Sequence, residues 1–149
     1  RHIVYSLRGR LDASLPIFNT PDVETIVLTT DRGAAALRSC GFEARATELR
    51  ADRLEDPAVL RRAHASLFAD RGVRYLDCEG GQTVLRALHG ARLLDEVFVT
   101  ETDVVVDESR HQGVLRIFDF AAEGANLIAE GQTAADSGWR FRRWRFNRR

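Results

Sequence analysis

The stretch from Leu76 to Arg86, LDCEGGQTVLR, holds the residues best suited to bind a charged ligand. A strand-like apolar run ends at Asp77 or Cys78, two glycines follow, and a helix is predicted to begin directly after them. Glycines lack the Cβ atoms that keep a bulky anion away from the backbone. The first turn of a helix also presents N–H groups without intrahelical acceptors and a partial positive charge. The pattern therefore predicts a phosphate or pyrophosphate site at Gly80 and Gly81.

Glu79 is the unusual member of this turn, because a carboxylate would repel a phosphate that approaches the same amides. It is better suited to accept hydrogen bonds from hydroxyl or amino groups of a neutral portion of a ligand. The alternative interpretation is that Gly80 and Gly81 form only a tight turn between a strand and a helix, with Glu79 in solvent. The residues alone leave both interpretations open.

The elements that must position this turn alternate along the chain. β-branched content and apolar periodicity predict strands at residues 2–6, 23–30, 42–49, 73–78 and 95–106, and helices at 33–40, 57–71 and 82–94. Such alternation is typical of βαβ units and a mostly parallel sheet. Ligands of these folds bind at the carboxyl ends of the strands, which is where Gly80 and Gly81 are expected to lie.

The pattern changes after residue 106, where a polar loop precedes strand candidates at 125–132 and 138–146. These two strands are predicted to form an antiparallel hairpin, with a bulge at Arg142 and Arg143. The predicted fold class is α/β: a mixed, mainly parallel sheet flanked by helices, with a C-terminal antiparallel hairpin. The simplest organisation is one domain over residues 1–149.

The C-terminal stretch SGWRFRRWRFNRR offers a competing function, because arginines interleaved with aromatic residues can bind single-stranded nucleic acid. A terminal strand is favoured, since Trp139 and Phe141 alternate with Arg140 and Arg142 as they would in a strand with one buried face. We therefore expect no nucleic-acid partner.

Composition limits the other possibilities. Lys+Arg and Asp+Glu both number 22, so no net charge attracts nucleic acid or an anionic membrane to the whole molecule. The sequence shows neither a long apolar run nor a signal-peptide pattern, and we expect a cytoplasmic protein without a membrane partner. Cys40 and Cys78 are predicted to be free thiols, and Cys78 has no histidine nearby in sequence to activate it as a nucleophile. The four histidines lack metal-ligand spacing, so no metal is predicted.

Residues 73–100, VRYLDCEGGQTVLRALHGARLLDEVFVT, resemble the strand, E-G-G, T-L-x-x-A-L and G-L-V-D-E-L block of the reductase domain of riboflavin biosynthesis. That domain is a pyrimidine reductase related to dihydrofolate reductase. The spacing agrees without a gap from Glu79 to Glu96. Upstream, RHIVYSLRGRLDASLPIF followed by ETIVLTT is similar to the family's R-V-V-L-D/S, proline-containing loop and I-V-L-T-T. The E-G-G block is the most specific part of the resemblance.

The resemblance implies a dihydrofolate-reductase-like fold that binds NADPH. It places the backbone amides of residues 81–85 against the pyrophosphate and nicotinamide, Glu79 against the substrate, and Ser6 and Arg8 near the adenosine 2′-phosphate. The cofactor-binding residues that it implies are Ser6, Arg8, Thr30, Gly80, Gly81, Gln82, Thr83, Val84 and Leu85. For three of them a structural role is an equal alternative: Ser6 as a turn former, Arg8 as a solvated side chain and Thr30 as a strand residue.

The implied function is NADPH-dependent reduction of a phosphoribosylaminopyrimidine, as in riboflavin biosynthesis, or of a related small heterocycle, by a cytoplasmic homodimer. The alternative is a non-catalytic or truncated reductase-like domain that serves binding or assembly. Relatives carry a further strand and a first cofactor loop upstream of the matching segment, so we expect this chain to lack them and to bind the cofactor weakly by itself. After Glu101 the sequence TDVVVDESRHQG also departs from the family's proline and leucine-leucine-glycine-glycine run.

Overall fold

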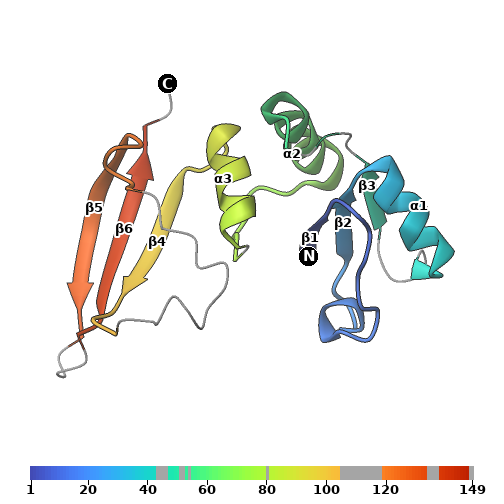
Figure 1. Ribbon diagram of the computed structural model, residues 1–149, viewed down its shortest axis with the longest axis horizontal. Helices are drawn as coiled ribbons and strands as arrows, with labels where there is room; N and C mark the ends of the chain where they lie inside the picture. The colour runs from blue at the N-terminus through green and yellow to red at the C-terminus, as the bar shows by residue number, and fades with distance from the viewer. Residues whose placement is uncertain are drawn as a thin grey trace. The chain divides into compact units, whose positions relative to one another are not determined.

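The computed structural model describes residues 1–42, 47–50, 53, 55–79, 81–104, 119–133 and 138–147, with residues 47–50 described by their backbone. Gly80 lies outside the described residues. The chain divides into two compact units, Arg1–Ala91 and Arg92–Arg149, which Figure 1 shows and which we describe one at a time. The expectation that residues 1–149 form one domain stays a prediction.

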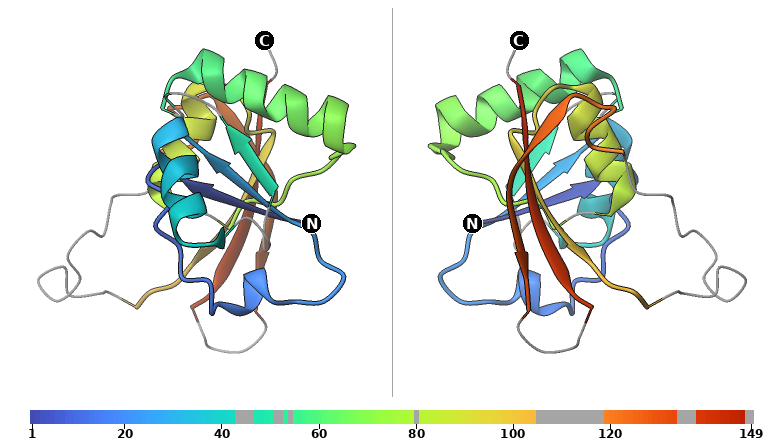
Figure 2. Two further views of the ribbon diagram at one scale, coloured as in Figure 1. Left: turned by 90° about the vertical axis from the view of Figure 1, so that its right-hand side faces the viewer. Right: turned by 90° about the vertical axis from the view of Figure 1, so that its left-hand side faces the viewer.

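Unit 1 contains a three-stranded parallel sheet. Its strands are β1 (His2–Ser6), β2 (Thr25–Thr29) and β3 (Thr47–Arg50), and they lie in the order β1-β2-β3. All five residues of β2 are buried, as expected for a central strand made of apolar and threonine side chains. Helix α1 (Asp31–Ser39) packs against β2 and β3, and Figure 2 shows it alongside the sheet. The predicted parallel arrangement of these strands is thereby confirmed.

The core of unit 1 forms where aromatic residues from two loops meet the sheet. Phe18 ends a short 3-10 helix, Pro16–Phe18, and packs edge-to-face on Phe42 with ring centroids 4.8 Å apart. Val27 of β2 and Leu37 of α1 complete this buried cluster. The core therefore joins the strand, the helix and the loop after β1 into one body.

Helix α2 (Pro57–Arg71) has the predicted bounds. The Asp56 carboxylate accepts hydrogen bonds from the amides of Ala58 and Val59, and Gly72 ends the helix with φ of 62°. Helix α3 (Gln82–Gly90) packs against α2. Phe68 of α2 is 53% exposed, and the Arg74 guanidinium lies over its ring at 4.3 Å.

Residues 73–78 do not form the predicted strand, because they make no ladder with a neighbour. They nevertheless run beside β1 in the parallel sense. At one end the Arg1 guanidinium donates to the Arg71 carbonyl, and at the other Cys78 lies close enough to Tyr5 to affect its ionisation. The β-branched and aromatic content of this segment favours extended backbone, but a strand also needs backbone partners on its flank. The prediction was right about direction and wrong about pairing.

Unit 2 contains a three-stranded antiparallel sheet in the order β4-β6-β5, made of β4 (Glu96–Glu101), β5 (Ala125–Gln132) and β6 (Arg140–Phe146). The β5–β6 pairing confirms the predicted hairpin (Figure 1). Two expectations are corrected. The ladder irregularity falls on β5 between Leu127 and Ala129 rather than at the paired arginines of β6. The mixed α/β class holds, but β4 pairs only antiparallel, so the described strands divide equally between the two sheet types.

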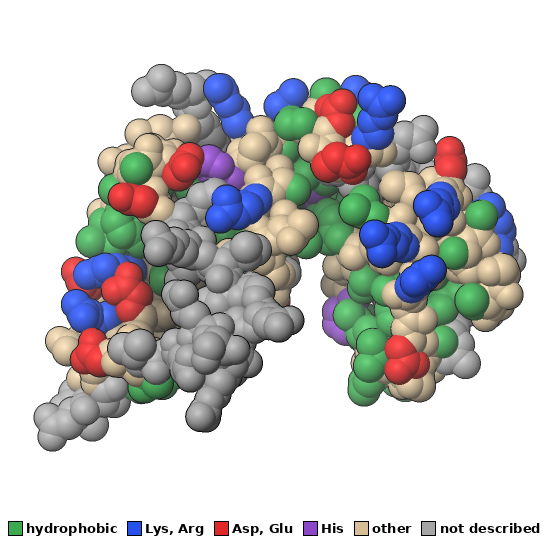
Figure 3. All heavy atoms as spheres, in the orientation of Figure 1, with side chains coloured by type: hydrophobic (Ala, Val, Ile, Leu, Met, Phe, Trp, Pro, Cys, Tyr) green, Lys and Arg blue, Asp and Glu red, His purple; other side chains and the backbone are tan. Residues whose placement is uncertain are grey.

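The arginines of β6 are held by acidic side chains on its two neighbours. Arg142 lies 2.9 Å from Glu101 and 3.1 Å from Glu130, and Glu96 pairs with both Arg143 and Arg145. Arginine and acidic side chains accordingly lie side by side over this sheet in Figure 3. The C-terminal stretch is a strand, as favoured from the sequence, and whether it binds nucleic acid stays untested.

Among the described helices, none has the length and apolar character needed to cross a membrane.

Candidate functional site

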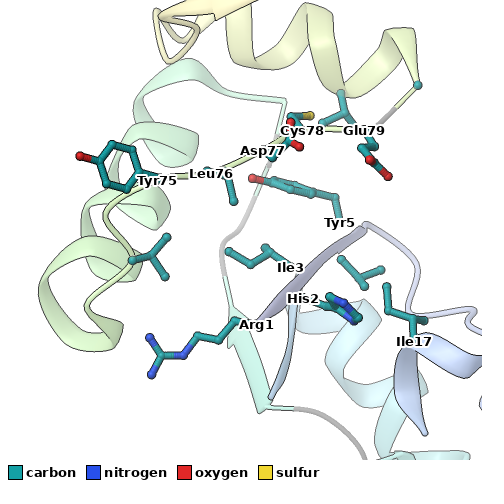
Figure 4. Close-up of a pocket in the computed structure, with 14 residues that line it drawn as sticks. Arg1, His2, Ile3, Tyr5, Ile17, Tyr75, Leu76, Asp77, Cys78 and Glu79 are labelled. Carbon is teal, nitrogen blue, oxygen red and sulfur yellow. The ribbon is translucent and has the colours of Figure 1, made fainter. Parts of the chain in front are cut away.

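A cleft of about 900 Å³ opens in unit 1 between β1 and the extended segment that precedes α3 (Figure 4). This volume lies within the range of small-molecule binding sites. Its lining comes from β1 and its N-terminal neighbour, from Ile17, from residues 73 and 75–79, and from the start of α3 at Gly81 and Val84. The cleft occupies the space left because residues 73–78 lie beside β1 without ladder hydrogen bonds.

The start of α3 is open to ligands. Gly81 is the N-cap residue, with φ of −64° and ψ of 174°, and no side chain caps the helix. A Cβ atom at Gly81 would meet no atom of the described residues within 4 Å beyond its chain neighbours. Other helices of unit 1 differ: Thr30 caps α1 and Asp56 caps α2. Among the described residues, the start of α3 is thus uncapped, and its role as an anion site stays a prediction.

The hydrogen bonds at the start of α3 show which backbone amides are left to donate to a bound anion. The amides of Val84 and Leu85 both donate to the Gly81 carbonyl, at 3.0 and 3.1 Å. These two amides are committed to the helix, whereas those of Gly81 and Thr83 have no acceptor within the described part of the chain. Of the amides of residues 81–85 predicted to contact the cofactor, those of Val84 and Leu85 are therefore already used within the helix. Val84 instead contributes its side chain to the cleft wall.

Glu79 lies in the cleft wall and is exposed, next to half-buried Cys78 (Figure 4). A solvent-facing carboxylate beside the helix start suits the predicted contact with hydroxyl or amino groups of a ligand. Cys78 and Cys40 are both free thiols. No cluster of three or more His, Cys, Asp or Glu side chains suitable for a metal ion occurs in the described residues.

The other predicted cofactor residues gather at the carboxyl ends of β1 and β2. The Thr30 hydroxyl accepts from the Gly33 amide at 3.1 Å and donates to the Leu7 carbonyl at 2.8 Å, so Thr30 has a structural role as the N-cap of α1 and not as the strand residue of the alternative. Ser6 pairs in register with Thr29, whose hydroxyl donates to the Ser6 carbonyl at 2.6 Å. Arg8 follows in an exposed turn.

Two glycines that sequence reasoning did not single out, Gly9 and Gly33, lie against each other and let the turn after β1 approach α1 closely. Gly9 has φ of 61°, and a Cβ atom added to it would overlap the Gly33 carbonyl group. A Cβ atom at Gly33 would in turn overlap the Thr29 hydroxyl. The backbone of the turn after β1 therefore approaches α1 more closely than side chains permit, and this approach fixes where Ser6 and Arg8 lie.

Sequence reasoning also missed the polar pair formed by Tyr5, which lines the cleft, and His64 of α2. The Tyr5 hydroxyl lies 2.7 Å from His64 Nε2, and the two rings stack with centroids 6.0 Å apart. Burial, and to a lesser degree nearby Cys78, raises the pKa of Tyr5, and burial lowers the pKa of His64. The two residues lie on separate elements, and no local sequence pattern connects them.

Comparison with known proteins identifies the fold. No protein-family model and no curated protein matches the sequence. Two solved forms of RibD from Acinetobacter baumannii match 96% and 98% of this chain, each with a TM-score of 0.65 and 17% identity. A pyrimidine reductase-like protein from Corynebacterium diphtheriae matches 99% of the chain with a TM-score of 0.66 and 17% identity. The chain spans 36–37% of the RibD chains and 61% of the Corynebacterium protein. The chain has the fold found in these proteins.

Proposed function

We propose that this chain belongs to an NADPH-dependent reductase that acts on a phosphoribosylaminopyrimidine or a related small heterocycle. The observation that carries the proposal is the uncapped start of α3 at Gly81, which opens beside a cleft in a fold shared with RibD and a pyrimidine reductase-like protein. An anion-binding helix start next to an organic-ligand cleft suits a ligand with both a diphosphate and a ring.

The open space at Gly81 supports this choice of cofactor. Gly81 leaves room for a diphosphate. The amides of Gly81 and Thr83 would donate hydrogen bonds to its oxygens. Ser6 and Arg8, at the carboxyl end of β1, would hold the 2′-phosphate that distinguishes NADPH from NADH. Bound NADPH would supply the hydride.

The contribution of the chain to the reaction would be positioning. The cleft would hold the heterocycle, with Glu79 accepting hydrogen bonds from its hydroxyl or amino groups. Since the hydride comes from the cofactor, the proposal assigns no acid or base to the described residues. Holding the two reactants in the correct orientation can by itself account for a large part of a rate enhancement.

The direct test is to titrate the chain with NADPH and with NADH and to follow the fluorescence of the nicotinamide. The proposal expects saturable binding of NADPH that exceeds binding of NADH. Binding of neither nucleotide would instead favour the alternative, a non-catalytic or truncated reductase-like domain that serves binding or assembly.

Glu79→Gln tests how the roles are divided within the site. We expect this variant to keep the affinity for NADPH within about twofold, because the amides and not the carboxylate hold the cofactor. Turnover of an aminopyrimidine substrate should fall about tenfold or more, since a neutral amide is a weaker acceptor than a carboxylate. Equal losses in cofactor affinity and turnover would contradict this division.

A further inference from the structure

The Tyr5–His64 pair has a fixed direction that follows from its second hydrogen bond. His64 Nδ1 lies 2.9 Å from the carbonyl oxygen of Leu60, in the preceding turn of α2. A carbonyl oxygen can only accept, so Nδ1 must carry the proton and donate. In a neutral imidazole the other nitrogen, Nε2, is then an acceptor. The Tyr5 hydroxyl, 2.7 Å from Nε2, is therefore the donor of the pair.

This direction decides what Tyr5 can offer to a ligand. The single hydroxyl proton of Tyr5 is directed to His64, so its oxygen can act toward the cleft only as an acceptor. Among the described residues, no other hydrogen-bond partner of this hydroxyl is found. Tyr5 is half-buried in the cleft wall and extends from β1 toward the segment that carries Asp77 and Cys78 (Figure 4).

The oxygen is also a neutral acceptor. Burial raises the pKa of Tyr5, so the phenol keeps its proton at neutral pH, and burial lowers the pKa of His64, so the imidazole stays uncharged. The ring of Tyr5 lines the cleft together with the apolar side chains of Ile3 and Leu76. A ligand ring placed beside Tyr5 would thus meet the apolar side chains of Ile3 and Leu76 and an uncharged acceptor, whereas Asp77 and Glu79 supply carboxyl groups elsewhere in the cleft wall.

We propose that Tyr5 is a specificity-determining residue of the cleft, held by His64 as a positioning residue so that its oxygen selects a ligand ring bearing an amino or hydroxyl donor. The direction of the hydrogen bond is independent of the proposed reductase function, and only the choice of a pyrimidine ring rests on it. A ring that presents a carbonyl or ring nitrogen at the same place would put two acceptors face to face, which is unfavourable.

The test compares two probes that differ in a single donor, 5-aminouracil and uracil, by calorimetric or NMR titration. One neutral hydrogen bond corresponds to a preference of about fivefold for 5-aminouracil in the unchanged protein. Tyr5→Phe retains the ring and removes this acceptor, so the preference should fall below that of the unchanged protein. His64→Leu leaves the hydroxyl without its acceptor and free to donate to a ligand, so the preference should fall or reverse.

A measurement without a ligand tests the orientation itself. The ¹⁵N chemical shifts of His64, identified by comparison with the His64→Leu variant, should show a neutral ring protonated at Nδ1 near neutral pH. A ring protonated at Nε2 would overturn the proposal, as would an unchanged preference in Tyr5→Phe or binding of neither probe. Failure of NADPH to bind together with a preserved 5-aminouracil preference would instead refute the proposed function and leave the role of Tyr5 standing.

Discussion

At the scale of single residues, the candidate site divides into what a sequence can indicate and what it cannot. Glu79 and Gly81 were proposed from the sequence because they lie together in one short turn before a helix, a local pattern typical of ligand-binding sites. Tyr5 and His64 were not, because their hydrogen bond joins residues 59 positions apart on a strand and a helix. Thr30 shows a third case, in which a residue at the right strand end has both its hydrogen bonds within the protein.

His64 gives the stability of the protein a dependence on pH whose sign follows from its environment. Burial lowers its pKa below the ordinary value of 6.5, so the unfolded chain takes up a proton more readily than the folded one. Stability linked to His64 is fully present above that value and is lost as the pH falls through the lowered pKa. Tyr5, whose pKa is raised, keeps its proton throughout and adds nothing to this slope.

Urea unfolding at about pH 7 and about pH 5 measures the effect. We expect the unchanged protein to lose more of its unfolding free energy between these two values than His64→Gln, which cannot titrate but can still accept from Tyr5. Equal losses in the two proteins would show that His64 does not contribute to the pH dependence.

At the scale of elements, helix ends that carry a local signal were the most predictable feature, whereas α3 ends at Gly90 and not at the predicted residue 94. Asp56, Gly72 and Gly41 mark helix ends through side-chain capping or positive φ, both of which are local. The β5–β6 hairpin is also local and was predicted, but its bulge was assigned to the wrong strand. The pairing of residues 73–78 depends on partners far away in sequence. The alternation of strands and helices therefore predicted their parallel direction but could not show that they lack a ladder.

The contact between the turn after β1 and α1 predicts a difference between two glycines of similar conformation. Gly9 and Gly41 have φ of 61° and 68°, but a Cβ atom would overlap the Gly33 backbone at Gly9 and meet nothing within 4 Å at Gly41. Gly41→Ala should cost about 1 kcal/mol for the left-handed backbone alone. Gly9→Ala should cost about 2–4 kcal/mol, because overlap adds to that strain.

Denaturant unfolding of both variants shows whether Gly9→Ala costs more than the backbone strain that the two variants share, because its Cβ atom overlaps the Gly33 backbone. Similar losses of unfolding free energy would mean that the turn after β1 does not pack against α1 as described. The Gly9 variant should also weaken NADPH binding if the turn carries Ser6 and Arg8 to the 2′-phosphate, whereas the Gly41 variant should not.

At the scale of the whole molecule, the sequence indicated the mixed α/β class and the resemblance to pyrimidine reductases, and the shared fold with RibD supports both. The expected single, mainly parallel sheet was not found among the described strands, because β4 joins an antiparallel sheet with β5 and β6. Which strand lies next to which is set by contacts across the whole chain, and periodicity carries no information about that order. The chain spans about three fifths of the Corynebacterium protein, so the activity of a complete reductase is a proposal for this chain.

The central claim is that uncovered amides at the start of α3 bind the diphosphate of a dinucleotide, and fluorescence titration of Gly81 variants with NADPH tests it most directly. A side chain at Gly81 has open space, so the variants should fold. Gly81→Ala should change the dissociation constant little, and Gly81→Asn should weaken binding by capping the amides. Gly81→Asp should weaken it by at least about tenfold more than Gly81→Asn, because it adds a negative charge beside the diphosphate. A dissociation constant for Gly81→Asp equal to that of the unchanged protein would contradict the claim.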